Sequence, residues 1–264
     1  MKLLENKTAI ITGATRGIGR GIAVEFAKQG ANVAFTFSSS VDAANALEIE
    51  LNALGIKAKG YQSNAAEFDT AQELAKEILK EFGSIDVLVN NAGTGWGAPF
   101  GQFPEKGWDK VMDLNVKSLF FLTQALHGPL KSAASKSQPG KVINIASIDG
   151  IRINAWETYS YQASKAAVIQ LTRRMATRLI KDHINVTAIA PGAFASEMNK
   201  AARDHEDEVG DRRRVHGAAG ARTHDGRDLG HDARRHRVAE EDVGVAAERE
   251  HALLNARTAG VVEP

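Results

Sequence analysis

The stretch from Lys7 to Gly19, KTAIITGATRGIG, constrains the fold of this chain more than any other part of it. Its first half is apolar and β-branched, as in a buried strand, and apolar residues recur at helical spacing after it. Gly13, Gly17 and Gly19 let the backbone turn tightly between these two elements. A helix that begins at such a turn presents unpaired N–H groups and a positive dipole end to a pyrophosphate. The stretch therefore predicts a strand, a phosphate-binding loop and a helix.

Stretches with strand and helix patterns alternate up to about residue 190. We expect strands at 32–37, 56–61, 85–89, 141–146 and 184–190, and helices at 41–54, 67–82, 105–131 and 158–181. This alternation predicts an α/β fold, a Rossmann-type doubly wound parallel sheet, in a nucleotide-binding and catalytic domain over residues 1–202. We expect the sheet to lack a regular last strand, because none is readable in the residues that follow.

The composition excludes several classes of protein. The chain has no Cys, which excludes disulfides, thiolate catalysis and Cys-ligated zinc, and we expect no metal site. It has no apolar run of the ~18 residues that cross a membrane. We therefore expect a soluble, cytoplasmic protein without a membrane partner.

A serine lies upstream of a tyrosine and a lysine that are four residues apart, in the stretch from Ser147 to Lys165. On a helix, Tyr161 and Lys165 lie on one face, so that a phenol and an ammonium share a small volume. A nearby ammonium stabilises the phenolate and is expected to lower the phenol pKa, which makes the tyrosine a general acid or base. Ser147, at the end of a strand, is placed to donate a hydrogen bond to a substrate oxygen.

The segment after the second predicted strand bears on the choice of nucleotide. An acidic residue there would bind the ribose 2′-hydroxyl of NAD and repel a 2′-phosphate. This chain has Ser38 and Ser39 instead, and Arg16 lies in the glycine loop. The pattern favours NADP(H), although Arg16 is also compatible with a plain surface cation.

These motifs together resemble the short-chain dehydrogenase/reductase family over residues 6 to about 200. The resemblance rests on TGATRGIG at 12–19, NNAG at 90–93, Asn115, Ser147, Tyr161 with Lys165, and Pro191-Gly192. It implies that Tyr161 donates the proton, Lys165 binds the nicotinamide ribose, Ser147 orients the carbonyl and Asn115 holds a water in a proton relay. An Asn among apolar residues is, however, more often a satisfied core amide. The implied cofactor contacts are Gly13, Thr15, Arg16, Gly17, Ile18, Gly19, Ser38, Ser39, Asn64, Asn91, Ala92, Gly93, Tyr161, Lys165, Pro191, Gly192 and Ser196.

Within the family, residues 1–93 look most like bacterial 3-oxoacyl-[acyl-carrier-protein] reductases. The following part looks more like reductases of rhamnolipid-type 3-hydroxyacyl metabolism. The resemblance implies NADPH-dependent reduction of a small-molecule or carrier-bound 3-oxoacyl thioester by a homodimer or homotetramer. Asn64, where the family usually has an Asp at the adenine, and Ser196, where it has a Thr, are departures that keep a hydrogen-bonding group.

The serious departure is the segment 203–264. It contains 11 of the 17 Arg and six of the eight His, but no Lys, Ile, Met, Phe, Tyr or Trp. With 14 Asp and Glu its net charge is −3, which argues against a nucleic-acid-binding arm. Its His residues lack ligand spacing. We interpret the segment as out-of-frame translation of a GC-rich gene, and a genuine disordered extension is the alternative.

Two classes of function stay open at this stage. One is an active NADPH-dependent carbonyl reductase. The other is a nucleotide-binding remnant without turnover, because a missing last strand leaves a sheet edge bare and missing helices leave the substrate pocket incomplete.

Overall fold

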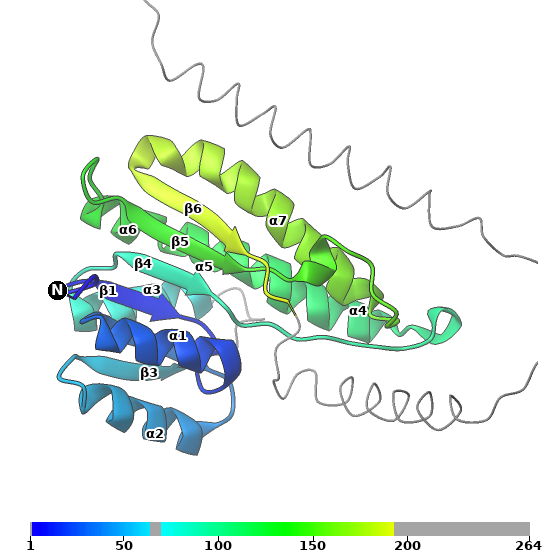
Figure 1. The fold of residues 1–264 in the computed structure, drawn as a ribbon, viewed down its shortest axis with the longest axis horizontal. Coiled ribbons are helices and arrows are strands. Elements are labelled where there is room, and N and C mark those ends of the chain that lie inside the picture. The colour runs from blue at the N-terminus through cyan, green and yellow to red at the C-terminus, as the bar shows by residue number, and fades with distance from the viewer. Residues whose placement is uncertain (1, 64–69, 193–264) are drawn as a thin grey trace, which may run out of the picture. The chain divides into compact units, whose positions relative to one another are not determined.

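The computed structural model describes residues 2–63 and 70–192, all within one compact unit, Met1–Glu208. They form a six-stranded, wholly parallel sheet in the order β3-β2-β1-β4-β5-β6 (Figure 1). The strands are β1 (Thr8–Ile11), β2 (Asn32–Phe37), β3 (Ala58–Gln62), β4 (Val87–Asn90), β5 (Gly140–Ile145) and β6 (Ile184–Ile189). Because the chain moves outward from β1 in both directions, the order reverses between β1 and β4, where such sheets bind ligands at the carboxyl ends of their strands.

Helices cover both faces of this sheet and create two separate cores. The α-helices are α1 (Gly17–Lys28), α2 (Val41–Asn52), α3 (Thr70–Phe82), α4 (Glu105–Met112), α5 (Ser118–Ala125), α6 (His127–Ala133) and α7 (Tyr159–Leu179). Side chains on one face of the strands, such as Ile10 and Leu88, pack in a core with α3, α5 and α7. Those on the other face, such as Ile11 and Phe35, pack with α1 and α2. The predicted Rossmann-type sheet is confirmed.

One predicted element is wrong. The single helix expected from 105 to about 131 is divided into α4, a π-turn (Asp113–Lys117), α5 and α6. Short 3-10 turns lie elsewhere in the chain, at Phe100–Gln102, Ile148–Gly150 and Ile180–Asp182. In the π-turn the N–H of Ser118 bonds to the carbonyl of Asp113, which inserts an extra residue into the helical ladder. The apolar pattern of the sequence continues across this turn, so it gave no sign of the break.

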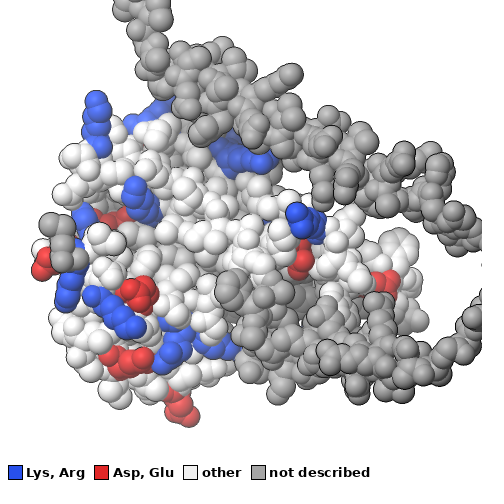
Figure 2. Space-filling view, viewed as in Figure 1, with Lys and Arg blue, Asp and Glu red and all other residues white. Residues whose placement is uncertain are grey.

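The charges on the molecular surface are mixed. On the face shown in Figure 2, Lys and Arg side chains are interspersed with Asp and Glu instead of forming one patch of a single sign. No helix within residues 2–63 and 70–192 combines the length and apolar character that crossing a bilayer requires.

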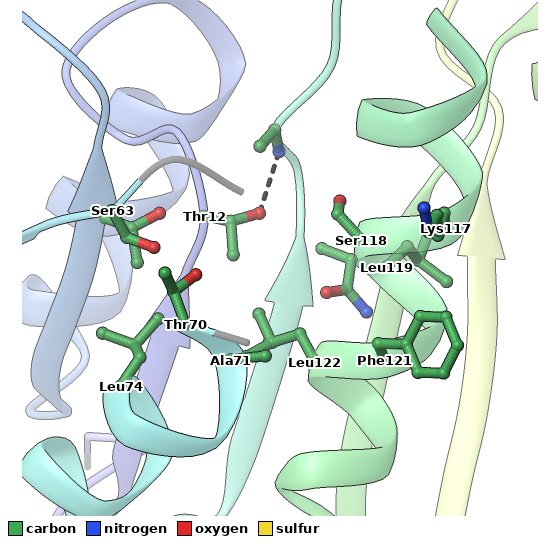
Figure 3. Close-up of a pocket in the computed structure, with 13 residues that line it drawn as sticks. Thr12, Ser63, Thr70, Ala71, Leu74, Lys117, Ser118, Leu119, Phe121 and Leu122 are labelled. Atoms are coloured by element: carbon green, nitrogen blue, oxygen red, sulfur yellow. Dashed lines mark hydrogen bonds between the residues drawn. The ribbon is translucent and has the colours of Figure 1, made fainter. Parts of the chain in front are cut away.

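A pocket lies at the carboxyl ends of the central strands, between the beginning of α3 and α5 (Figure 3). Hydroxyl groups of Thr12, Thr36, Ser63, Thr70 and Ser118 line it, together with apolar side chains of Leu74, Leu119 and Leu122. Asn90 also lines it, and the buried Oδ1 of this residue has no hydrogen-bond partner in the described part of the chain. An unpaired buried acceptor in a pocket fits a ligand or water that carries an N–H or O–H group.

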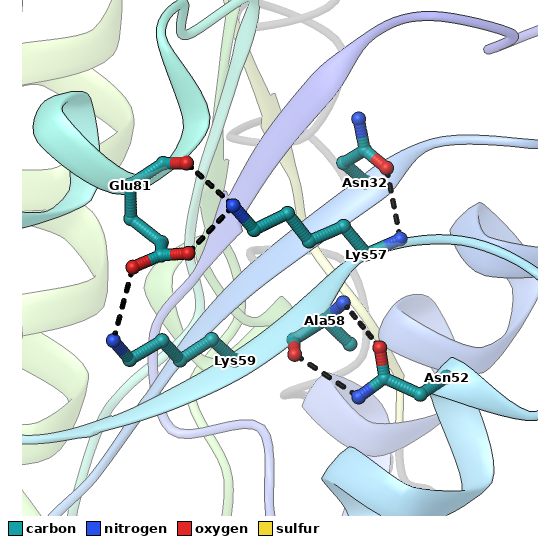
Figure 4. A network of polar contacts seen from close by, with 6 residues as sticks. All are labelled: Asn32, Asn52, Lys57, Ala58, Lys59 and Glu81. Atoms are coloured by element: carbon teal, nitrogen blue, oxygen red, sulfur yellow. Dashed lines mark hydrogen bonds and ion pairs between the residues drawn. The ribbon is translucent and has the colours of Figure 1, made fainter.

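The outer edge of β3 is occupied by side chains of α2 (Figure 4). Asn52 accepts a hydrogen bond from the N–H of Ala58 at 3.0 Å and donates one to the carbonyl of Ala58 at 3.1 Å. Glu48 accepts a hydrogen bond from the N–H of Gly60 at 2.7 Å. These are outward-facing backbone groups, because the carbonyl of Lys57 bonds to β2 and the direction alternates along a strand. The two side chains thus occupy positions that a neighbouring strand would take.

Three parts of the sequence analysis lie outside the described residues. They are the adenine contact expected at Asn64, the hydroxyl contact expected at Ser196, and the segment 203–264.

Candidate active site

The glycine loop and the loop after β4 are held together by one threonine at the end of β1. The hydroxyl of Thr12 accepts hydrogen bonds from the N–H groups of Asn91 and Ala92, each at 2.9 Å. In return the Asn91 amide donates to the carbonyls of Thr12, at 2.8 Å, and Gly13, at 3.1 Å. These bonds fix the two segments side by side at the switch point of the sheet.

Glycine is required at two positions of this arrangement. A Cβ atom at Gly19 would lie 2.4 Å from the Asn91 Nδ2 and 2.6 Å from the Gly13 carbonyl oxygen. Gly13 has a φ of +63° and a Cβ there would lie 3.1 Å from Ala92 Cα. The loop therefore packs α1 against the strands more closely than any side chain would allow.

The N-terminus of α1 is suited to an anion. Arg16 is its N-cap residue, and no side chain forms a capping hydrogen bond to this helix. The first turn contains no acidic residue. The N–H groups of the first turn are therefore available to phosphate oxygens. Thr15 is partly buried, whereas Arg16, Gly17 and Ile18 are exposed.

The residues after β2 complete the nucleotide side of the site. Ser38 and Ser39 are exposed, and Thr36 accepts a hydrogen bond from the N–H of Gly13 at 3.3 Å. Arg16 makes no ion pair within the described residues. Arg16 and the two exposed serines are all potential donors to a phosphate, and Arg16 is not already paired with a carboxylate of the described residues.

Tyr161 and Lys165 lie in the first two turns of α7, beside Ser147 at the end of β5. The Lys165 Nζ is 5.6 Å from the centroid of the Tyr161 ring and donates a hydrogen bond to the Ile145 carbonyl at 2.8 Å. The Ser147 hydroxyl accepts a hydrogen bond from the N–H of Asp149 at 3.1 Å, which leaves its proton to donate to an acceptor such as the phenol oxygen of Tyr161. The structure thus brings the three predicted catalytic side chains together.

Burial changes the proton affinity of both titratable groups. It lowers the pKa of Lys165 from 10.5 to about 8, because the ammonium is cut off from water. Burial also raises the pKa of Tyr161, while its hydrogen bond with Ser147 lowers it and the charge of Asp149 raises it.

The expectation that Lys165 lowers the pKa of Tyr161 is wrong for the protein without a bound nucleotide. The pKa of Tyr161 is raised, and the hydrogen bond that opposes this rise comes from Ser147. The physical reason is that burial disfavours the charged phenolate, and Lys165 is not among the groups that shift the pKa of Tyr161. A phenol that keeps its proton is the form required of a proton donor.

Asn115 lies in the π-turn, fully buried, with its side chain saturated by the protein. Its Oδ1 accepts a hydrogen bond from the N–H of Thr94 at 2.9 Å. Its Nδ2 donates one hydrogen bond to the Thr94 carbonyl, at 3.0 Å, and another to the Ser164 hydroxyl, at 2.9 Å. Ser164 in turn donates to the Tyr161 carbonyl at 2.7 Å. The side chain therefore connects the loop after β4 to the catalytic helix, whereas the water relay implied by the resemblance stays a prediction.

The remaining predicted residues border the same volume. A Cβ at Gly93 would lie 3.2 Å from the Asn115 Oδ1 and 3.6 Å from the Lys165 Nζ. Pro191, followed by the exposed Gly192, accepts a hydrogen bond from the N–H of Ile148 at 2.9 Å. Both segments thus lie next to the catalytic side chains.

The sequence analysis missed the residues that position this site. The Thr12 hydroxyl accepts hydrogen bonds from the backbone N–H groups of Asn91 and Ala92, whereas the backbone of Thr94 and the hydroxyl of Ser164 both bind the Asn115 side chain. Ser164 lies between Tyr161 and Lys165, so its place in the motif was a usable sign. Thr94 acts through its backbone alone, which no side-chain pattern reveals.

Comparison with known proteins agrees with this geometry. The family model described as short chain dehydrogenase matches residues 7–207. The chain is 40% identical, over 199 residues, to the 3-oxoacyl-[acyl-carrier-protein] reductase FabG of Staphylococcus epidermidis, covering 75% of this chain and 80% of that protein. It is also 40% identical to the rhamnolipids biosynthesis 3-oxoacyl-[acyl-carrier-protein] reductase of Pseudomonas aeruginosa, over 75% of this chain and 76% of that protein.

Other similar proteins differ in their substrates. The chain is 38% identical to the 2-dehydro-3-deoxy-D-gluconate 5-dehydrogenase of Escherichia coli, covering 77% of this chain and 78% of that protein. Among solved structures, the Pseudomonas aeruginosa RhlG/NADP active-site complex superposes with a TM-score of 0.73 at 38% identity, covering 79% of this chain and 81% of that one.

Proposed function

The chain belongs to the short-chain dehydrogenase family, and from that premise we propose that it reduces the ketone of a 3-oxoacyl thioester with NADPH. The observation that carries this proposal is the convergence of Ser147, Tyr161 and Lys165 next to a glycine loop and an uncapped helix N-terminus. The product is the corresponding 3-hydroxyacyl thioester.

The cofactor site fits a dinucleotide with a 2′-phosphate. The pyrophosphate would be held by Gly13, Gly17, Gly19 and the first turn of α1. Arg16, Ser38 and Ser39 provide donors to the 2′-phosphate. The pocket that contains Ser63 would receive the adenine end. Asn91, Ala92, Gly93, Pro191 and Gly192 would hold the part of the dinucleotide nearer to Tyr161 and Lys165. The reported NADP complex of a similar structure supports this choice.

Each catalytic side chain has a role that its environment permits. When bound, the reduced nicotinamide supplies a hydride to the ketone carbon. Ser147 donates a hydrogen bond to the carbonyl oxygen and holds it near the phenol, and Tyr161 donates its proton to that oxygen. The raised pKa of Tyr161 keeps the phenol protonated in the free protein. Lys165 binds ribose hydroxyls and stabilises the tyrosinate that the proton transfer leaves.

The substrate class rests on the relatives and not on the described residues. Both 3-oxoacyl-[acyl-carrier-protein] reductases are 40% identical to this chain, and either a carrier-bound or a small thioester is compatible with the site. The second candidate is reduction of a sugar-acid ketone, which the 38% identity to the gluconate dehydrogenase favours. We also infer that the protein acts in the cytoplasm as a homo-oligomer. The alternative is a nucleotide-binding protein without turnover, which an activity measurement distinguishes from the reductase.

The test is turnover of acetoacetyl and longer 3-oxoacyl thioesters with NADPH, followed as loss of NADPH absorbance, with 2-dehydro-3-deoxy-D-gluconate as the competing substrate. Tyr161→Phe is expected to reduce kcat about 10²- to 10⁴-fold, because a positioned general acid contributes that much. NADPH affinity should stay near that of the wild type, since the hydroxyl adds little to dinucleotide binding. A Phe variant that keeps a tenth of the wild-type rate or more would place the proton donor elsewhere.

A further inference from the structure

Glu157 connects two loops that flank the catalytic tyrosine. Its carboxylate Oε1 accepts hydrogen bonds from the N–H of Phe100, at 3.1 Å, and from the hydroxyl of Tyr159, at 2.7 Å. Its backbone carbonyl accepts a third, from the N–H of Ala98 at 3.2 Å. One residue of the connection between β5 and α7 therefore holds the connection between β4 and α4 at two points.

The loop that Glu157 holds runs along Tyr161. A Cβ atom built at Gly95 would lie 3.8 Å from the Tyr161 ring, and one built at Gly97 would lie 3.6 Å from the side chain of Thr158. At its other end the loop is held by Asn115 through the backbone of Thr94. With glycine at 95 and 97, the path between these ends depends on the two attachments, because glycine itself restricts the backbone least.

The segment that carries Glu157 is itself fixed to the catalytic helix. The Gln162 side-chain amide donates to the Asn154 Oδ1 and the Trp156 carbonyl, each at 3.2 Å, and to the Thr158 hydroxyl at 3.3 Å. Gln162 directly follows Tyr161, so the segment that carries Glu157 is attached to the same helical turn as the phenol. The order of attachment is α7, then the 154–158 segment, then Glu157, then the 98–100 segment.

Large apolar side chains stand exposed on the two joined loops. Phe100 is 79% exposed, Ile151 61% and Ile153 92%. Aromatic contacts continue from Glu157 into this region, since the Tyr159 ring lies 5.5 Å from Phe100 and 5.7 Å from Phe103, both edge to face. Exposed apolar side chains on loops that flank the predicted catalytic tyrosine fit an apolar part of a substrate that extends outward from the site.

We propose that Glu157 is a positioning residue that holds the 94–100 loop as one wall of the substrate entrance, where Phe100, Ile151 and Ile153 contact an acyl chain. The proposal rests on the proposed function for the identity of the chain. Glu157 itself takes no part in proton transfer, and its effect is on the site that binds the part of the substrate distant from the carbonyl.

The experiment compares four variants of the full chain with 3-oxo thioesters of N-acetylcysteamine carrying either a four-carbon or a twelve-carbon acyl group. Glu157→Ala removes both side-chain acceptor contacts, whereas Glu157→Gln keeps an acceptor oxygen for both donors. Tyr159→Phe removes one donor and keeps the ring. Glu73→Ala, at an exposed position of α3, is the matched control.

We expect Glu157→Ala to raise KM for the long substrate about tenfold, the effect of losing hydrogen bonds to a charged acceptor. KM for the short substrate and kcat should change less than about threefold, because the short chain ends before the wall. Glu157→Gln and Glu73→Ala should stay near the wild type, and Tyr159→Phe should fall between. An equal effect of Glu157→Ala on both substrates, or none, overturns the proposal.

Amide hydrogen exchange of residues 94–103 measures, without any substrate, whether Glu157 holds the 94–100 loop. Exchange there should be about tenfold faster in Glu157→Ala than in Glu157→Gln if the side chain holds the loop. Unchanged exchange rejects the attachment even in an active enzyme. A wild type that turns over no thioester rejects the proposed substrate, while the exchange result still stands by itself.

Discussion

Lys165 is a cation held where a neutral side chain would be more stable. Only 5% of the residue is exposed, and Ile145 supplies the one hydrogen bond to its Nζ within the described residues. Burial lowers its pKa to about 8. The charged form of Lys165 therefore opposes folding, a cost that the proposed role of its ammonium at the ribose and the tyrosinate would explain.

This conflict predicts that the stability of the protein depends on pH in the alkaline range, above the range of acid denaturation. Between pH 8 and 10.5 the unfolded chain binds more protons at Lys165 than the folded one, so the free energy of unfolding rises with pH there. Below pH 8 the buried ammonium is charged in the folded protein and lowers the free energy of unfolding by its full amount. Lys165→Met should therefore be more stable than the wild type at pH 7 by about 2 to 3 kcal/mol. Urea unfolding of both proteins at pH 7 and 10 measures this difference, which should shrink at the higher pH. A constant difference would contradict the shifted pKa.

Arg16 is predicted to set the choice between the two nicotinamide cofactors. A charge-assisted contact to a 2′-phosphate contributes about 1.5 to 3 kcal/mol, so Arg16→Ala should weaken NADPH binding roughly 10- to 100-fold and leave NADH binding nearly unchanged. Fluorescence titration of both cofactors measures the two dissociation constants. Arg20→Ala is the control, because Arg20 pairs with Glu50 on the exposed surface of α1 and α2. Equal losses for both cofactors would show that Arg16 does not contact the 2′-phosphate.

The sequence predicted the residues whose chemistry is visible in their side chains and missed those that act by geometry. The pairing of Tyr161 with Lys165 followed from helical spacing, and the proximity of Ser147 followed from its place at a strand end. Glu157 and Thr94 lie in irregular loops, whose contacts depend on the tertiary fold and leave no periodic pattern.

At the scale of elements, a buried chain of polar side chains connects two central strands with the helices that cover them. Asn90 on β4 donates to Thr123 on α5 at 3.1 Å and to Asn144 on β5 at 2.9 Å. Asn144 donates to Thr172 on α7 at 2.8 Å. These bonds fix the lateral position of α7, and with it Tyr161, relative to the sheet.

Asn144→Ala should therefore destabilise the protein by about 2 to 4 kcal/mol, because it opens a cavity and leaves buried donors and acceptors unpaired. Asn144 is fully buried, whereas Asn185 on the adjacent strand is partly exposed and serves as the control. Asn185→Ala should change stability by less than about 0.5 kcal/mol. The urea midpoints of both variants give the comparison, and equal midpoints would show that the polar chain contributes little.

The division of the predicted 105–131 helix shows where periodicity fails. A π-turn adds a residue without interrupting the apolar pattern, so Met112, Leu114 and Leu119 gave no sign of it. The second break did leave a sign, because Pro129 lies in the first turn of α6, the place where proline fits a helix start. The strand and helix bounds elsewhere differ from the prediction by at most two residues, apart from the start of α3, where the predicted residues 67–69 lie outside the described part of the chain.

At the scale of the whole molecule, Asp182 anchors the end of α7 to α6. Its carboxylate is 2.7 Å from Lys131, 2.9 Å from His127 and 2.9 Å from Arg178. Lys131 first, then His127 and Arg178, hold the pKa of this carboxyl well below its usual range. Three cationic or basic partners from two helices thus converge on one acid.

Acid should weaken this anchor. A carboxylate whose pKa is lowered by folding stabilises the protein above its ordinary pKa of about 4, and this contribution is lost as pH falls below that value. Asp182→Asn should therefore melt at a lower temperature than the wild type at pH 7, and the difference should decrease as the pH is lowered toward 3. Thermal melts over this range measure it, with the exposed Glu77→Gln as control. A difference that is constant with pH would assign the effect to packing.

The side chains bound along β3 make the two edges of the described sheet unequal in their ability to accept another strand. An incoming strand at β3 must first displace Asn52 and Glu48 from Ala58 and Gly60. At the opposite edge of the described sheet, the register turns the backbone groups of Val186 and Ala188 outward from β5. The β3 edge is therefore protected against the addition of a further strand, which opposes edge-to-edge aggregation there.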